Sequence, residues 1–174
     1  RLAVGGARGV WLFDAAHGGS SCRGVVTRSP VVRLCWLSGG ATLAYVLRDW
    51  SVGVVEERTG DVTLLYTSER RARERPIEAG AALVCVTARQ PPVVAVSGLG
   101  QASVLLVTCG GPEQGSSGKL KVQGKAPLTA IAAHPSAPAV AVAAADGTVK
   151  LYDMLAKKAE ARHVLAVEPP GGGG

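Results

Sequence analysis

Apolar residues occur along this chain in short runs, and most runs are closed by glycine, proline, serine or aspartate. The region from Leu128 to Asp153 shows the pattern most clearly. Two prolines, Pro135 and Pro138, exclude one continuous helix through it. Asp146-Gly147-Thr148 is a tight-turn signal, because glycine tolerates a positive φ and aspartate bonds its own backbone two residues on. The pattern therefore predicts three short antiparallel strands, at 128–133, 139–144 and 149–153.

The same pattern recurs upstream. Residues 31–56 align with 128–153 without a gap, so that Asp49 matches Asp146 and Glu56 matches Asp153. The beginning of the chain carries the second half of another copy, in which Phe13-Asp14 matches Tyr152-Asp153, and a weaker copy covers 81–108. The units end at 14, 56, 108 and 153. Intervals of about 40–50 residues are what a four-stranded propeller blade requires.

At the residue level these units resemble the repeats of the WD-repeat β-propeller family. Its hallmark is strand, turn, strand, Asp-Gly-Thr-Val and an aromatic-Asp ending, as in the unit that ends at Asp153. The resemblance implies an all-β propeller segment of about four blades, each a four-stranded antiparallel meander, within a larger ring of seven or eight blades. The expected blades are 1–27 (partial), 31–67, 81–123 and 127–167, with 169–174 as a Pro/Gly linker or end.

The fourth, outer strand of each blade is the least marked in the sequence. We expect these strands at 24–27, 62–66, 119–122 and 163–167. Residues 110–118 are rich in glycine and serine and are predicted to form a flexible loop. Residues 154–162 are polar and are predicted to form a helical turn or a long loop.

Several departures from the family pattern affect what the repeats can do. The Gly-His pair that often opens a repeat is absent, and the Trp-Asp ending is replaced by Phe-Asp, Glu-Glu and Tyr-Asp. The buried hydrogen-bond network of strong repeats therefore cannot form in full, and the blades should rely on apolar packing. We interpret the repeated acidic and turn residues as structural and not catalytic: Asp14, Asp49, Glu56, Asp146, Gly147 and Asp153.

Composition agrees with a strand-rich chain that carries no obvious chemistry. Of the 174 residues, 47% are apolar and only 4% aromatic, so the core is built mainly from valine, leucine and alanine. The four cysteines are widely spaced and are interpreted as small core residues of a reducing compartment, which predicts a cytoplasmic protein. The three histidines show no metal-ligand spacing. We expect no metal, no cofactor, no membrane span and no enzymatic activity.

One stretch supports a different class of function. The segment VVAVSGLGQAS places Gly98-Leu99-Gly100 after an apolar strand, as at the opening of a dinucleotide-binding fold. Ser103 stands where a third glycine or alanine is needed, and the residues that follow favour strand over helix. A glycine-rich hairpin turn is the preferred interpretation, and a nucleotide-cofactor-binding enzyme is the weaker alternative.

The densest charge run, ERRARER, covers 69–75. Its arginines are the candidates for partner binding: Arg70, Arg71, Arg73 and Arg75. The ordinary alternative is a solvated connection between blades. Net charge is +6, but the run mixes both signs and lacks aromatic residues, so nucleic-acid binding is not expected.

The sequence thus predicts a scaffold that binds other proteins through its loops within a large assembly. Divergent repeats, the Ala/Gly/Arg bias and the His134-Pro135-Ser136 turn resemble cilia- and flagella-associated WD-repeat proteins. That resemblance implies microtubule or axonemal partners and a place in the cilium, flagellum or cytoskeleton. The alternative is an adaptor of a soluble complex, such as a ubiquitin ligase or a trafficking coat.

Overall fold

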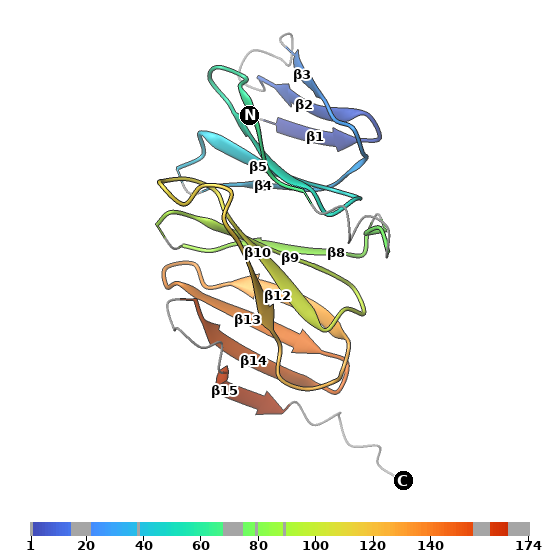
Figure 1. Ribbon diagram of the computed structural model, residues 1–174, viewed down its shortest axis with the longest axis vertical. Helices are drawn as coiled ribbons and strands as arrows, with labels where there is room; N and C mark the ends of the chain where they lie inside the picture. Colours follow the sequence, from blue (N-terminus) through green and yellow to red (C-terminus); the bar gives the residue numbers. More distant parts are fainter. Residues whose placement is uncertain are drawn as a thin grey trace.

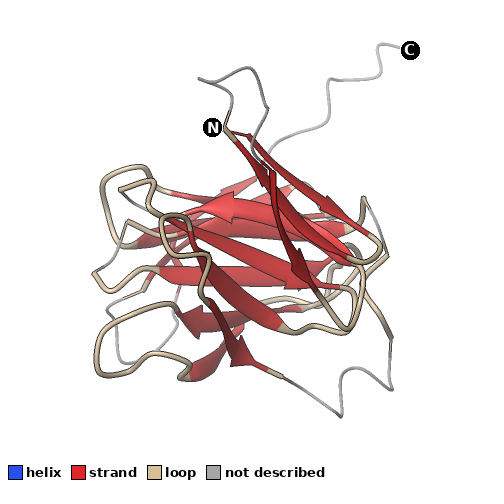
Figure 2. Cartoon of the chain, turned by 90° about the horizontal axis from the view of Figure 1, so that it is seen from above, coloured by secondary structure: helices blue, strands red, loops and turns tan. Residues whose placement is uncertain are grey.

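The computed structural model of the protein describes residues 2–14, 22–37, 39–67, 75–78, 80–88, 90–154 and 161–166. Every regular element among them is a strand (Figure 2). The first two sheets contain β1 (Leu2–Gly6), β2 (Gly9–Phe13), β3 (Cys22–Val26), β4 (Val31–Trp36), β5 (Thr42–Leu47), β6 (Val52–Glu56) and β7 (Val62–Tyr66). The other two contain β8 (Ala82–Val86), β9 (Val93–Gly98), β10 (Ser103–Thr108), β11 (Ser117–Lys121), β12 (Leu128–Ala133), β13 (Ala139–Ala144), β14 (Thr148–Asp153) and β15 (Ala161–Ala166).

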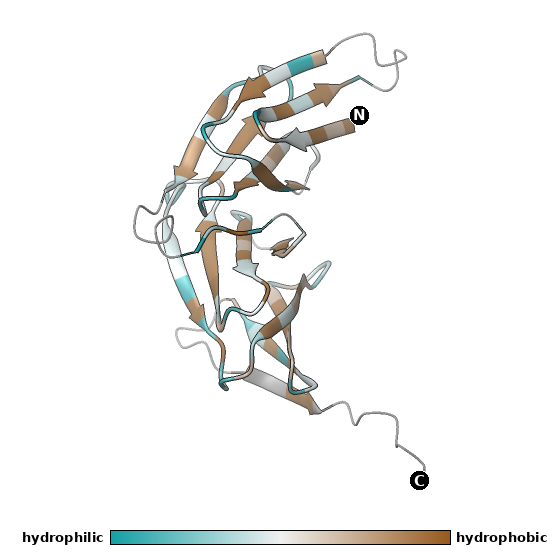
Figure 3. Cartoon of the chain, turned by 90° about the vertical axis from the view of Figure 1, so that its right-hand side faces the viewer, coloured by the Kyte–Doolittle hydropathy of each residue, from teal (hydrophilic) through white to brown (hydrophobic). Residues whose placement is uncertain are grey.

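Each sheet is an antiparallel meander in which neighbouring strands follow one another along the chain. The strand orders of the four sheets are β1-β2-β3, β4-β5-β6-β7, β8-β9-β10-β11 and β12-β13-β14-β15. The four sheets are stacked in sequence order along the long axis of the molecule (Figure 1). Seen from the side, the stack is curved (Figure 3). The first strands of the last three sheets, β4, β8 and β12, contact one another in turn.

The core lies between the sheets, because each sheet buries its apolar face against the next one. Three clusters fill the three interfaces, and each draws on both of its neighbouring sheets. The first cluster contains Val10 of β2 and Tyr45 of β5, and the second contains Val46 of β5 and Val94 of β9. The third cluster contains Val104 of β10. Stability of this kind is a sum of contacts between neighbouring repeats.

Burial follows the position of a sheet in the stack. All six residues of β9 are buried, because the third sheet is covered on both faces. In β13, only Val140 and Val142 are buried, and the alternate residues are half-exposed. The two strands are similar in sequence, VVAVSG and AVAVAA. The difference therefore comes from the number of neighbouring sheets and not from the strand itself.

Three outer strands begin earlier than expected. β3 begins at Cys22, β11 at Ser117 and β15 at Ala161, each two residues before the predicted start. The first residues of these strands could not be recognised from the sequence, because an outer strand has one solvated edge and needs little apolar character.

The glycine-rich stretch before β11 also differs from the expected flexible loop. It contains a hydrogen-bonded turn, in which the Gly115 N–H donates to the Thr108 carbonyl at 2.9 Å. Gly111 and Gly115 have φ of 68° and 82°, a region that glycine enters at little cost. The predicted helical turn or loop at 154–162 lies largely outside the described residues, as does the predicted end at 169–174.

No helix among the described residues is long and apolar enough to cross a membrane.

Candidate functional site

The structure describes only the last of the four candidate arginines. Arg70, Arg71 and Arg73 lie outside the described residues. Arg75 is exposed, and its backbone carbonyl accepts a hydrogen bond from Nε1 of Trp50 at 2.8 Å. The connection that carries the arginine run is thus attached at its end to the turn between β5 and β6.

Trp50 makes this attachment from an unusual backbone conformation. It is the one residue other than glycine with a positive φ, 70°, in the described part of the chain. Its side chain is only 3% exposed, and a Cβ on Gly98 would lie 3.6 Å from its indole ring. Trp50 therefore reaches from the second sheet to the end of β9 in the third.

Polar contacts surround the same turn. The Arg28 guanidinium donates to Oγ of Ser51 at 2.7 Å and lies 3.4 Å from the Asp49 carboxylate. Asp49 also accepts the Ser51 backbone N–H at 3.0 Å. Arg28 precedes β4, so these contacts join the entrance of the second sheet to its middle turn.

A second ion pair joins the turn to the residues that follow Arg75. Arg48 and Glu78 approach to 2.9 Å with both side chains largely exposed, and the Ile77 N–H donates to the Arg48 carbonyl at 2.8 Å. An exposed pair of this kind contributes at most about 1 kcal/mol. The backbone bond and the buried Ile77 side chain are the stronger part of this attachment.

The remaining repeat residues lie at strand ends and turns. Glu56 and Asp153 end β6 and β14, and Asp14 directly follows β2. Asp146 accepts the backbone N–H of Thr148 at 3.0 Å and its hydroxyl at 2.6 Å. These two donors lower the pKa of the Asp146 carboxyl below its ordinary value.

Gly98-Leu99-Gly100 lies at the hairpin between β9 and β10. The chain enters a strand after this turn, and not the helix start on which a dinucleotide pyrophosphate would rest. The Gly100 N–H donates to the carbonyl of Leu128 at 3.1 Å, so it is engaged by the next sheet. This stretch therefore does not have the geometry that the cofactor alternative requires.

The cysteines are free thiols with different surroundings. Burial raises the pKa of Cys85 to about 12 and that of Cys109 to about 11, which keeps both thiols protonated near neutral pH. Cys35 has a raised pKa for the same reason, whereas the Cys22 side chain is exposed. Within the described ranges, no group of three or more potential ligands is placed to hold a metal ion.

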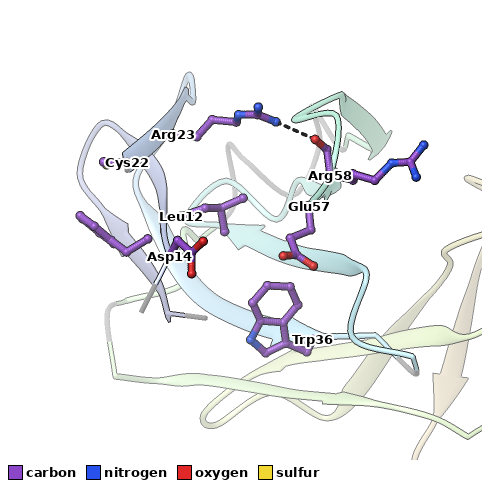
Figure 4. Close-up of a pocket in the computed structure, with 8 residues that line it drawn as sticks. Leu12, Asp14, Cys22, Arg23, Trp36, Glu57 and Arg58 are labelled. Carbon is purple, nitrogen blue, oxygen red and sulfur yellow. Dashed lines mark hydrogen bonds between the residues drawn. The ribbon is translucent and has the colours of Figure 1, made fainter. Parts of the chain in front are cut away.

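A pocket of about 390 Å³ lies between the first and second sheets (Figure 4). The first sheet provides one wall, from the end of β2 and the beginning of β3, and the second sheet provides Trp36 and the turn after β6. The lining residues are Leu12, Phe13, Asp14, Cys22, Arg23, Trp36, Glu57 and Arg58. The pocket combines a hollow, an aromatic ring and charged groups.

The side chains of this pocket point in different directions. In Figure 4 the carboxylates of Asp14 and Glu57 are directed toward the same space as the ring of Trp36. Arg23 crosses between the sheets and donates from Nη1 to the Arg58 carbonyl at 3.2 Å. The side chain of Arg58 points away from the pocket. The lining thus combines two carboxylates, two arginines and an aromatic ring.

The likeness to solved structures identifies the fold. Three crystal structures of Sqt1 from Chaetomium thermophilum match 94% of this chain. One is bound to the N-terminus of the ribosomal protein L10 and has a TM-score of 0.62 at 23% identity. The others have TM-scores of 0.68 and 0.64 at 22% and 21% identity. The fold is a partial β-propeller. The predicted fold class of about four antiparallel blades is confirmed.

The likeness covers part of each solved structure. The chain spans 42–44% of the length of these solved structures. No protein-family model matches it, and the comparison with curated proteins gives no match. The larger ring of seven or eight blades stays a prediction.

Sequence reasoning missed the pocket between the first two propeller blades. Its members come from four separate stretches, and no motif links them. Trp36 is 37% exposed at the end of β4, an unusual exposure for the largest side chain in a chain poor in aromatic residues. The exposure of Trp36 next to the charges of Glu57 and Arg58 can be recognised only in the folded structure.

Proposed function

We propose that this chain is a non-catalytic scaffold whose propeller blades bind segments of other proteins within a larger assembly. The pocket between the first two blades carries the proposal. Tryptophan and arginine are the residue types most often found at the energetic centres of protein interfaces. Here Trp36, Arg23 and Arg58 border one hollow of about 390 Å³, the size of a small binding pocket.

The likeness to Sqt1 supports the same class of function without specifying it. One of the matching structures holds the N-terminus of another protein. A curved stack of rigid blades can present loops and pockets to an extended partner segment. We therefore favour a protein segment over a small molecule as the occupant of the pocket.

We propose a ciliary or flagellar axonemal complex as the setting, with microtubule-associated or axonemal partners. This part of the proposal is supported by the style of the repeats and by the His134-Pro135-Ser136 turn. An adaptor subunit of a soluble cytoplasmic complex is the alternative. It is favoured by the likeness to a propeller that binds a ribosomal protein.

Site-specific photocross-linking tests the proposal. Benzoylphenylalanine is introduced at Arg58, on the pocket rim, and separately at Val26, which is 89% exposed and does not line the pocket. The full-length protein is then irradiated in its native extract, and the adducts are identified by mass spectrometry.

Defined partners captured from position 58 and not from position 26 would support protein binding at the pocket. Tubulin or axonemal coiled-coil proteins would favour the ciliary setting, and adaptor or coat subunits would favour the soluble one. Equal capture from both positions, or none, would contradict docking at the pocket.

A further inference from the structure

The first sheet has an open edge at β1. Each four-stranded sheet has a first strand, β4, β8 or β12, which pairs with its second strand. Because Phe13-Asp14 matches Tyr152-Asp153, β1 corresponds to the second strand β13, and no strand among the described residues pairs with its other edge. We infer that an extended segment of a partner protein adds to β1 as the first strand of this sheet.

The exposure of β1 shows that its edge is accessible. β13 is the matched comparison, because its sheet also packs against one other sheet in the structure. β13 is paired on both sides, and it has two buried residues and no exposed one. β1 is paired on one side, and it has three exposed residues and no buried one. An edge strand of this kind presents unpaired N–H and C=O groups to a chain that can pair with it.

A hollow of about 230 Å³ lies beside this edge. It is lined by Gly5 of β1 and by residues 31–34 of β4. Val31 and Leu34 belong to the apolar cluster between the first two blades but are only half-buried. β1 packs on β4 at this point, since a Cβ on Gly5 would lie 2.7 Å from Cγ1 of Val31. The free edge of β1 and apolar side chains of β4 therefore border the same space.

The strand β8 indicates what the added segment should look like. It contacts both β4 and β12, and its apolar residues alternate between two sides. Val84 and Val86 pack toward the second sheet, whereas Leu83 and Cys85 pack toward the fourth. In a strand added to β1, the equivalents of Leu83 and Cys85 would face the hollow. We therefore expect a segment of about five residues with apolar side chains at two positions separated by one residue.

An added strand would continue a row that already exists. β4, β8 and β12 contact one another in turn, and each is antiparallel to the second strand of its sheet. In such strand addition, the main-chain hydrogen bonds supply affinity and the contacts of alternate side chains supply specificity. A second copy of the chain is a poorer source, because its strands of this pattern are already paired within their own sheets.

The first test measures binding of a labelled synthetic peptide to the complete chain by fluorescence anisotropy. The peptide carries ALVAV, the β8 sequence with alanine in place of cysteine, between glycine and serine flanks. Two further versions are N-methylated at alternate residues, one at the odd and one at the even positions. One version should lose at least about tenfold in affinity and the other should keep it, because a strand added at an edge is paired along one side only.

A pair of leucine variants tests the position of the bound peptide. Leu34→Ala should weaken binding by about tenfold, since it removes apolar surface from the hollow. Leu64→Ala is the matched control, because Leu64 is a 45% exposed leucine of the same sheet that does not line the hollow. Thermal unfolding of both variants separates loss of binding from loss of folding. Absence of binding, equal loss with the two methylated peptides, or equal binding by the two variants would overturn strand addition at β1.

The second test identifies the source of the strand. Benzoylphenylalanine is introduced at Arg33, which is exposed and lines the hollow, and the full-length protein is irradiated in its native extract. Support requires a captured segment of another protein that carries the expected pair of apolar residues. A cross-link within the same polypeptide or to a second copy would assign the edge to the protein's own chain and overturn docking of a partner, as would the absence of an adduct.

The outcomes also separate this edge from the proposed function. The hollow beside β1 and the pocket that contains Trp36 and Arg58 share no lining residue. Capture from position 58 without capture from position 33 would leave protein binding at the pocket intact and remove the strand site. Capture from position 33 alone would retain strand addition and remove the pocket.

Discussion

The turn between the second and third strands has the same backbone form in blade 2 and in blade 4, but its surroundings are opposite. Trp50 has a φ of 70° in blade 2, and the aligned Gly147 has a φ of 80° in blade 4. In both turns the preceding aspartate accepts the N–H of the residue two positions on, at 3.0 Å. Trp50 and Ser51 in the turn of blade 2 are buried, whereas in blade 4 Asp146 is exposed and Gly147 and Thr148 are only partly buried.

The comparison shows how a residue with a strained backbone conformation is retained. A side chain in the left-handed region costs roughly 1–2 kcal/mol, which glycine avoids. Burying an indole ring and satisfying its N–H outweighs that cost. Trp50 obtains both from neighbours that are distant in sequence, Gly98 and the Arg75 carbonyl. Blade 4 has no such neighbours over its turn in the described part of the chain, and glycine occupies the position.

The largest expected effect is on Trp50. Trp50→Ala should lower the free energy of unfolding by about 3–5 kcal/mol, because a buried ring is lost and the strained φ remains. Trp50→Gly should be about 1 kcal/mol more stable than Trp50→Ala, since glycine relaxes the backbone. Denaturant unfolding followed by circular dichroism measures both. If alanine and glycine are equally stable, the φ of 70° stores no strain.

A smaller effect is expected in blade 4. Gly147→Ala should lower the free energy of unfolding by about 1–2 kcal/mol, because alanine must adopt a φ of 80° without any compensating burial. Gly147→Asn is the control and should lose less, since asparagine tolerates this conformation. The same unfolding measurement applies, and an unchanged stability in Gly147→Ala would mean that the exposed turn simply rearranges.

Buried and exposed cysteines should also differ in their reactivity. The pKa of Cys85 is about 12, so its thiol should stay protonated and resist a thiol reagent at pH 8, whereas the exposed Cys22 should react at once. Unfolding returns Cys85 to its ordinary pKa of 9.0. Its contribution to stability is therefore complete below pH 9 and is lost as the pH rises toward 12.

Mass spectrometry of a timed alkylation distinguishes the two thiols, with the denatured chain as the reference in which they react alike. Rapid modification of Cys85 in the folded chain would show that blades 3 and 4, between which Cys85 packs, separate readily.

The smallest effect concerns the carboxyl of Asp146. The hydroxyl and N–H of Thr148 lower the pKa of Asp146, so this group stabilises the fold above its unfolded-state pKa and stops doing so as the pH falls through the folded value. Thr148→Val removes the hydroxyl and should raise the pKa of Asp146 toward its ordinary value. A carbon-detected NMR titration measures the pKa of Asp146, and an unchanged value would exclude the Thr148 hydroxyl as a cause of the shift.

The sequence by itself determined the local elements of this protein. Apolar runs a few residues long, closed by prolines and by signals such as Asp146-Gly147-Thr148, can form only short strands and turns, and their repetition predicted the blades. These signals depend on the backbone preferences of neighbouring residues, which can be recognised without a structure. The bounds of the outer strands, such as β11, were harder to predict, because a strand with a solvated edge does not need apolar residues.

Only the tertiary structure decided what lies between the blades. Residues 31–56 and 128–153 align without a gap, yet nothing in that alignment shows that Trp50 reaches Gly98 or that Asp14, Trp36 and Glu57 border one pocket. These contacts join residues from different repeats, and their geometry depends on how sheets stack. A repeat pattern describes each blade alone, and the binding surface arises where two blades meet.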